Sequence, residues 1–177
     1  MRRIAALGMA VITCLAIPSS GHATSLKDVQ VGIRTVEFLR APPLGRTDVA
    51  IVYDRRRKAS EDDARAILVW LLDNSQGSKV EIAPILVEIG ELATLRRFPV
   101  AMIANGVPAD QFPRILDYSR LNGTVTISSD LSCVHAGQCT LGISSSPRVE
   151  VILIRQVATS CGIDFLEAFR MMVKEEY

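Results

Sequence analysis

Apolar runs and amphipathic segments alternate along most of this chain. The runs at 49–53 and 100–104 are continuously apolar, and the first is rich in β-branched residues, which is typical of strands covered on both faces. A third strand is expected at 124–128. A fourth, at 80–87, contains Pro84, which indicates an edge strand or a bulge. The helices expected beside these strands cover 29–39, 60–73, 92–97 and 110–120.

Capping residues support two of these helices. Ser25 and Asp28 have the spacing of a capping box before the first helix, and Ser60 is expected to cap the second. Towards the C-terminus the pattern predicts a hairpin of strands 140–144 and 149–154. Two helices then follow, at 156–160 and 165–175, with Gly162 between them as a C-cap.

This order of elements predicts an α/β fold. Strands that alternate with helices favour a mostly parallel sheet with helices on both faces, and the hairpin adds an antiparallel edge at the C-terminal end. We therefore expect a three-layer Rossmann-like or flavodoxin-like domain. Residues 24–177 contain no internal repeat and no linker, so they should form a single domain.

The N-terminus has the pattern of a secretory signal peptide. Arg2 and Arg3 precede an uncharged apolar stretch at 4–17, and small residues end at Ala23, after which we expect cleavage. The protein is therefore expected in the periplasm. Residues 24–177 carry 18 basic and 19 acidic side chains, a balance that argues against nucleic acid as a partner. No later segment is long and apolar enough to predict membrane insertion of the mature chain.

Cys133 and Cys139 are predicted to form a disulfide, because they are close in sequence and the expected compartment is oxidising. A zinc site that adds His135 to these two cysteines is the alternative, but no fourth ligand follows nearby. Cys161 is expected to be a buried, inert thiol. No phosphate-binding glycine loop is present, and we expect neither a cofactor nor a metal.

Polar residues follow three of the predicted parallel strands. Ligands of open α/β sheets bind outside the carboxyl ends of such strands, so these residues are candidate ligand contacts. Turn formation and helix capping would explain the same residues without a ligand. The chain has no Gly-x-Ser-x-Gly elbow and one histidine after residue 23, so we expect no catalytic residue and no enzymatic activity. The candidates are Tyr53, Asp54, Ser60, Asn105, Gly106, Ser128, Ser129 and Asp130.

The last predicted helix has an apolar face made of Phe165, Phe169, Met171 and Met172. Such a face is expected to lie in the core. Because methionine side chains adapt to many surfaces, a homodimer contact is the alternative.

Residues 124–173, which begin TVTISSDLSCVHAGQCTLGIS, resemble the C-terminal half of the YfiR/HmsC-type periplasmic proteins. The shared features are a strand, a cysteine-containing loop with a glycine, a hairpin and two closing helices. The resemblance implies a non-enzymatic regulator that restrains an inner-membrane diguanylate cyclase by protein contact, often as a disulfide-stabilised dimer. Cys133 and Cys139 would be the matching cysteines.

The hairpin and helices at the C-terminus are also similar to the closing segment of one lobe of ABC-type periplasmic solute-binding proteins. That resemblance implies a small-molecule ligand instead of a protein partner. The chain has length for only one such lobe.

Overall fold

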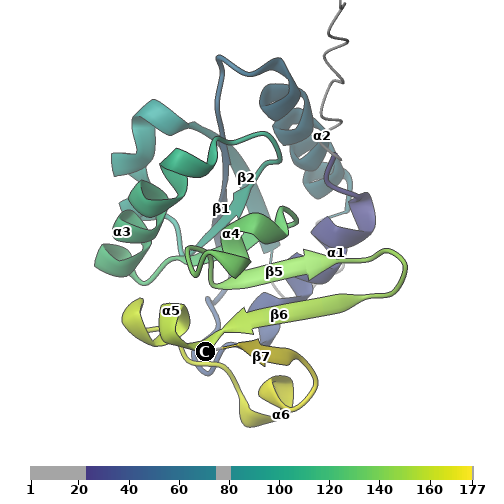
Figure 1. The fold of residues 1–177 in the computed structure, drawn as a ribbon, viewed down its shortest axis with the longest axis vertical. Helices are drawn as coiled ribbons and strands as arrows, with labels where there is room; N and C mark the ends of the chain where they lie inside the picture. Colours follow the sequence, from purple (N-terminus) through teal and green to yellow (C-terminus); the bar gives the residue numbers. More distant parts are fainter. Residues whose placement is uncertain (1–22, 75–80, 177) are drawn as a thin grey trace, which may run out of the picture.

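In the computed structural model, residues 23–74 and 81–176 are described, and they form one α/β unit (Figure 1). In chain order the elements are α1 (Leu26–Thr35), η1 (Val36–Phe38), β1 (Arg46–Tyr53), α2 (Lys58–Asn74), β2 (Glu81–Glu88), η2 (Ile89–Arg97), β3 (Val100–Ile103), η3 (Ala109–Gln111), α3 (Phe112–Asn122), β4 (Val125–Ser128), α4 (Leu131–His135), β5 (Leu141–Ser144), β6 (Glu150–Ile154), α5 (Arg155–Ser160), α6 (Glu167–Arg170) and β7 (Lys174–Glu176).

A single seven-stranded sheet organises the fold, in the order β2-β1-β3-β4-β5-β6-β7. Strands β1 to β5 are parallel, β6 is antiparallel to β5, and β7 runs parallel to β6. The order 2-1-3-4-5 of the parallel part is that of flavodoxin-like folds. The predicted fold class, with its mostly parallel sheet and antiparallel hairpin, is therefore confirmed.

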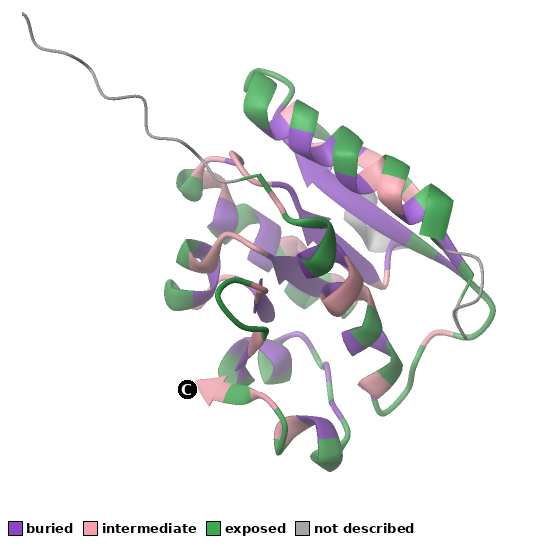
Figure 2. Cartoon of the chain, turned by 90° about the vertical axis from the view of Figure 1, so that its right-hand side faces the viewer, coloured by how far each residue is buried: buried purple, intermediate pink, exposed green. Residues whose placement is uncertain are grey.

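Helices cover both faces of the sheet, as neighbouring residues of β5 show. A Cβ added to Gly142 would meet the side chain of Val134 in α4. A Cβ added to Gly32 of α1 would lie 3.6 Å from the side chain of Ile143. Because successive residues of a strand point to opposite faces, α1 and α4 lie on opposite sides. Helix α2 packs beside α1, and α3 lies across the sheet from α2 (Figure 1). The central strands β3 and β4 are wholly buried between these layers, whereas α2 exposes its outer face (Figure 2).

Several local predictions are confirmed. Ser25 and Asp28 form a reciprocal capping box at the start of α1. Pro84 lies in β2, which is an edge strand of the sheet. Gly162 has φ 68°, directly after the Cys161 C-cap of α5. The predicted signal peptide, except its last residue Ala23, and Val80 lie outside the described residues.

Two local predictions are wrong. Ser60 does not cap α2, because the helix already begins at Lys58 and the Ser60 hydroxyl instead accepts the backbone N–H of Asp54 at 3.2 Å. The helix predicted at 165–175 is reduced to α6, since residues 174–176 turn back as β7 and pair with β6. The hairpin strand β6 is consequently an inner strand and not the edge.

The aromatic side chains near the C-terminus explain where that predicted helix is interrupted. Phe165 forms a bridge with Leu39, and the ring of Phe169 stacks between those of Phe38 and Phe165. Phe165 and Phe169 therefore lie in the core as expected, whereas Met171 and Met172 are 81% and 66% exposed. The apolar face predicted for all four residues does not form.

No helix within residues 23–74 and 81–176 has the length and apolar character needed to cross a membrane.

Candidate ligand-binding site

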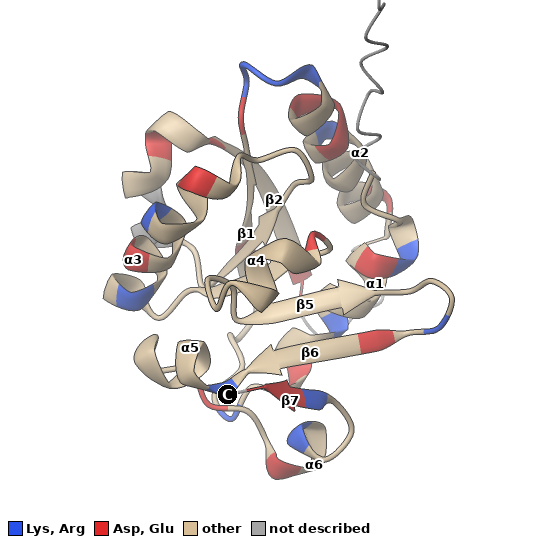
Figure 3. Ribbon diagram, viewed as in Figure 1, with Lys and Arg blue, Asp and Glu red and all other residues tan. Residues whose placement is uncertain are grey.

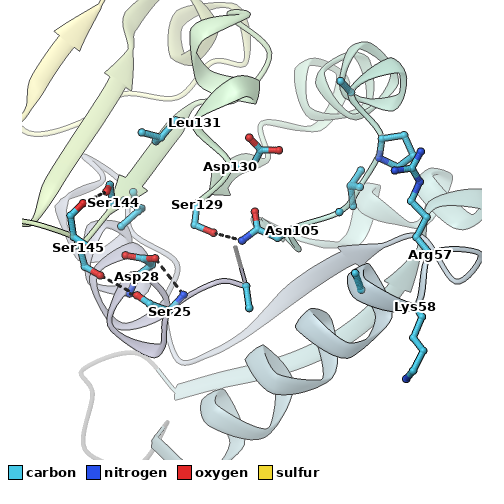
Figure 4. Close-up of a pocket in the computed structure, with 18 of the residues that line it drawn as sticks. Ser25, Asp28, Arg57, Lys58, Asn105, Ser129, Asp130, Leu131, Ser144 and Ser145 are labelled. Carbon is cyan, nitrogen blue, oxygen red and sulfur yellow. Dashed lines mark hydrogen bonds between the residues drawn. The ribbon is translucent and has the colours of Figure 1, made fainter. Parts of the chain in front are cut away.

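A cleft of about 1170 Å³ opens at the carboxyl ends of the central strands (Figure 4). The loop after β3 and the loop between β4 and α4 form its floor and one wall. The start of α1 and the β5–β6 turn form a second wall, and the start of α2 a third. This is the edge at which the arrangement of parallel strands predicts a ligand. The polar residues that line it are Ser25, Asp28, Arg57, Lys58, Asn105, Asp110, Ser129, Asp130, Ser144, Ser145 and Ser146.

Asn105 and Ser129 meet on the floor, as expected for residues after neighbouring parallel strands. The side-chain amide of Asn105 donates to the Ser129 hydroxyl at 3.0 Å (Figure 4). It also donates to the hydroxyl of Thr24 at 3.0 Å, and the Thr24 and Ser129 hydroxyls lie 2.9 Å apart. Three segments distant in sequence are thus joined by one hydrogen-bond network.

Asp63 of α2 anchors this network. Its side chain is 5% exposed, and it accepts three hydrogen bonds. The backbone N–H of Thr24 donates at 2.6 Å, the Thr24 hydroxyl at 2.7 Å and the backbone N–H of Asn105 at 2.7 Å. Hydrogen bonds to a charged acceptor in a buried setting are among the stronger ones, so this floor should be rigid.

Asp28 lines the cleft and has one unsatisfied carboxylate oxygen. Its Oδ2 accepts the backbone N–H of Ser25 at 3.2 Å, which is the second half of the capping box. Its Oδ1 is buried and has no hydrogen-bond partner, and the residue as a whole is only 9% exposed. Ser25 also contacts Ser145, with 2.9 Å between the two hydroxyl oxygens, so the wall beside Asp28 carries several hydroxyls (Figure 4).

The opposite wall begins at Asp130, which caps α4 by accepting the backbone N–H of Ser132 at 2.9 Å. The predicted disulfide between Cys133 and Cys139 is present and closes the loop that follows α4, with the two Cα atoms 5.5 Å apart. This covalent link fixes the short helix from which Asp130 and Leu131 reach the cleft.

Gly106 turns the chain sharply at the floor. Its φ is 81°, a left-handed conformation that favours glycine, and an added Cβ would lie 3.2 Å from the backbone nitrogen of Ser60. Both the left-handed backbone and the close approach of this turn to α2 therefore favour glycine at position 106.

Four of the eight predicted ligand contacts line the cleft, namely Asn105, Gly106, Ser129 and Asp130. The other four lie deeper. Tyr53 is 7% exposed and belongs to the core, and Ser60 is fully buried. The Ser128 hydroxyl accepts the backbone N–H of Asp130 at 3.0 Å, so it supports the wall from behind.

Asp54, the last of the four, orders the basic loop that joins β1 to α2. Its carboxylate is almost wholly buried and accepts the backbone N–H of Arg56 at 2.9 Å and the Arg56 Nε at 3.2 Å. The hydrogen bond from the Arg56 side chain lowers the pKa of Asp54 below its ordinary value. Figure 3 shows the resulting cluster of positive charge at the end of β1 nearest α2. Arg57 and Lys58 of this cluster reach the rim of the cleft.

Sequence reasoning missed Thr24 and Asp63, and it recognised Asp28 only as a helix cap. Asp63 did carry a signal: it precedes Ile67 and Leu71 at four-residue spacing, which places it on the buried stripe of α2. An acidic residue on such a stripe needs a hydrogen-bonding partner. Thr24 has no comparable local signal.

Within residues 23–74 and 81–176, no group of three His, Cys, Asp or Glu side chains is arranged to hold a metal ion. The cysteines of the alternative zinc site are bonded to each other, so their thiolates are not free as ligands. Cys161 is buried as predicted, and burial raises the pKa of its thiol. That shift disfavours the reactive thiolate form.

Comparison with known proteins gives likeness at the level of fold. No family model matches the chain, and no curated protein matches it. The ABC domain of a Streptococcus pneumoniae protein, solved in complex with L-Trp, superimposes with a TM-score of 0.59 at 10% identity. A conserved domain protein of Vibrio cholerae O1 biovar El Tor gives 0.60 at 9% identity.

These alignments cover 84% and 85% of this chain, but only 60% and 59% of the respective neighbours. The chain thus spans about three fifths of their length. At 10% and 9% identity the likeness is one of fold alone. The resemblance to the YfiR/HmsC-type regulators receives no support from these comparisons and stays a prediction. What the comparisons establish is that this chain shares its α/β fold with an ABC domain.

Proposed function

We propose that this protein binds a small solute carrying a protonated amine, in the cleft at the carboxyl ends of β1, β3 and β4. It acts by binding and not by turnover. Its place of action is the periplasm, which follows from the signal-peptide pattern before Thr24.

The unpartnered Oδ1 of Asp28 carries this proposal. Burying a carboxylate oxygen without a hydrogen-bond donor is unfavourable by about 1–3 kcal/mol or more. Most buried polar atoms in proteins have a partner, so an exception at a cleft needs an explanation. An ammonium group bound in the cleft beside Asp28 would supply the opposite charge, and a shift of the groups that cover Oδ1 would let it donate to that oxygen.

The rest of the lining suits a polar ligand of modest size. Hydroxyls of Ser25, Ser144 and Ser145 surround Asp28 on one wall, and the Asn105–Ser129 pair lies on the floor. The volume of the cleft accommodates a metabolite, with room left for water. The Streptococcus pneumoniae neighbour was solved with L-Trp, an amino acid that carries such an ammonium group, which supports the same class of ligand here.

Thermal unfolding in the presence of amino acids, polyamines and other primary amines tests the proposal. A ligand at a hundred times its Kd adds about 2.7 kcal/mol to the stability of the folded state. Asp28→Asn keeps a side chain of the same shape and an oxygen for the Ser25 N–H, but it removes the charge. We expect it to weaken binding at least tenfold.

Asp48→Asn is the matched control, because Asp48 is exposed on β1 and does not line the cleft. It should leave the affinity unchanged. If no amine stabilises the wild-type protein, or if Asp28→Asn binds as tightly as the wild type, the proposal is wrong.

A second hypothesis is the periplasmic regulator that restrains an inner-membrane diguanylate cyclase. The observation in its favour is the disulfide between Cys133 and Cys139, the pair that the resemblance assigns to this family. Deletion of the gene should then raise cellular cyclic di-GMP. Unchanged cyclic di-GMP would argue against this function and would leave the solute-binding proposal intact.

A further inference from the structure

The carboxylate of Asp63 is buried without a positive charge beside it. The hydrogen bonds that it accepts come from neutral groups of Thr24 and Asn105. Among the side chains that the structure describes, which leave out those of residues 94–97, no lysine, arginine or histidine forms an ion pair with it. A buried carboxylate with no countercharge is energetically costly, so we expect a cation beside Asp63.

The surrounding charges do not meet this need. Asp28 of α1 and Asp130 before α4 are acidic. The Lys58 ammonium at the start of α2 is paired with Asp62 at 2.9 Å, and the exposed Arg57 side chain is not in ion-pair contact with Asp63. The group that does lie against Asp63 is the backbone nitrogen of Thr24, 2.6 Å from Oδ1.

The peptide bond before Thr24 is the one that the sequence predicts to be cleaved. Ala23 is exposed, whereas Thr24 is fixed through both its backbone nitrogen and its hydroxyl. The chain therefore changes from exposed to anchored at the bond between these two residues. Small residues up to Ala23 provide the pattern that a signal peptidase recognises.

We propose that cleavage between Ala23 and Thr24 creates the missing cation, and that the new N-terminal ammonium of Thr24 forms a buried ion pair with Asp63. In this hydrolysis, catalysed by the signal peptidase of the exporting cell, water breaks the peptide bond. Ala23 leaves with a new carboxylate. The nitrogen of Thr24 becomes an amine and takes up a proton to become the ammonium.

Processing in this way would complete the floor of the cleft. The ammonium has three N–H donors in place of one, and it lies against Asp63, whose carboxylate also accepts the backbone N–H of Asn105. Cleavage also removes Ala23, which lines the cleft. The inference depends on processing and geometry alone and does not require that the cleft binds an amine.

The test uses the full-length chain, exported by a bacterial host and purified from its periplasm. Intact mass and N-terminal sequencing establish the first residue, which should be Thr24. Trace labelling with acetic anhydride across a pH series then gives the pKa of the α-amine, in the native protein and in urea. An unpaired α-amine titrates near pH 8.

In the native protein the ion pair should raise the pKa of the α-amine by about one unit or more, which lowers its labelling at pH 7 about tenfold relative to urea. Asp63→Asn should abolish most of this protection. Asp62→Asn, the matched control on the exposed side of the same turn of α2, should not.

Three results would overturn the proposal. The chain could begin at another residue, the α-amine could titrate alike in native and unfolded protein, or its pKa could stay raised in Asp63→Asn. If Asp63→Asn does not fold, the comparison of native and urea-unfolded wild type still decides the question.

Discussion

The floor of the cleft and the C-terminal segment 164–176 both carry many polar groups, but they use them differently. In the floor, Thr24, Asp63, Asn105 and Ser129 form a partly buried network that joins the segment before α1, α2 and two strand ends. In the C-terminal segment several charges pair on the surface, as in Arg40–Asp164, where both side chains are about 60% exposed, although the Arg170–Glu175 pair is partly buried.

The difference shows which polar groups hold the fold in place. Water competes for an exposed ion pair, so the pair adds little stability. Water is largely excluded from the network around Asp63, so a polar group there that loses its partner stays without a hydrogen bond. The architecture of the cleft should therefore depend on a few buried bonds, whereas exposed pairs of the C-terminal segment such as Arg40–Asp164 should tolerate changes of charge.

Among the polar groups of these two regions, the largest expected effect comes from Asp63→Ala. The substitution leaves the backbone N–H groups of Thr24 and Asn105 and the Thr24 hydroxyl without their acceptor, and we expect a loss of about 3 kcal/mol in the free energy of unfolding. Urea denaturation followed by circular dichroism measures it. Asp164→Ala, which removes an exposed partner of Arg40, is the control and should hardly move the midpoint. Equal effects of the two substitutions would contradict the comparison.

The disulfide beside the cleft comes next. Replacing Cys133 and Cys139 by serine opens a loop of six-residue sequence separation, for which the chain-entropy estimate gives about 2 kcal/mol. The loss should appear in urea denaturation of the double variant, and reduction of the wild type should reproduce it. Thiol titration of unfolded, unreduced chain 24–177 should find one free thiol, that of Cys161. Three thiols before reduction would mean that the disulfide is absent.

Much of this fold could be predicted because the strands have a recognisable local sequence pattern. The runs at β1 and β3 are apolar throughout since both faces of the sheet are covered, and parallel strands bring their carboxyl ends to one edge. The meeting of Asn105 with Ser129 follows from those two facts. The edge position of β2 follows from Pro84, which cannot donate to a neighbouring strand.

The remainder depends on contacts that leave no local pattern. Thr24 reaches partners 39 and 105 residues away, and nothing in the residues around it marks that role. β7 consists of Lys174, Glu175 and Glu176, which have no strand-like alternation, and it forms because β6 offers an unpaired edge. The sequence marks Asp28 as a helix cap, but its unpartnered second oxygen depends on the packing of α1 beside the cleft, which has no local pattern.

A smaller effect is expected from acid, through the loop beside the cleft. Because the Arg56 hydrogen bond lowers the pKa of Asp54 in the folded state, the carboxylate contributes stability above its unfolded pKa of about 3.9. This contribution is lost as the pH falls below about 4 and through the folded-state pKa. Urea midpoints measured from pH 6 to pH 2 should therefore fall less steeply for Asp54→Asn than for the wild type. Arg56→Gln should flatten the curve in the same direction, and an unchanged slope in both variants would contradict this account.

The smallest effect is expected where apolar side chains face solvent. Met171 and Met172 are 81% and 66% exposed, so replacing both by serine removes almost no buried surface. The free energy of unfolding should change by no more than about 0.5 kcal/mol, as for other exposed positions. Phe169→Ser, two residues earlier but buried in the aromatic stack, is the contrasting variant and should be strongly destabilising.

Sedimentation of the double methionine variant sharpens the comparison further. If the chain forms a homodimer through this surface, the variant will sediment as a monomer at concentrations where the wild type does not. The two methionines would then be dispensable for the stability of the single chain but required for the dimer.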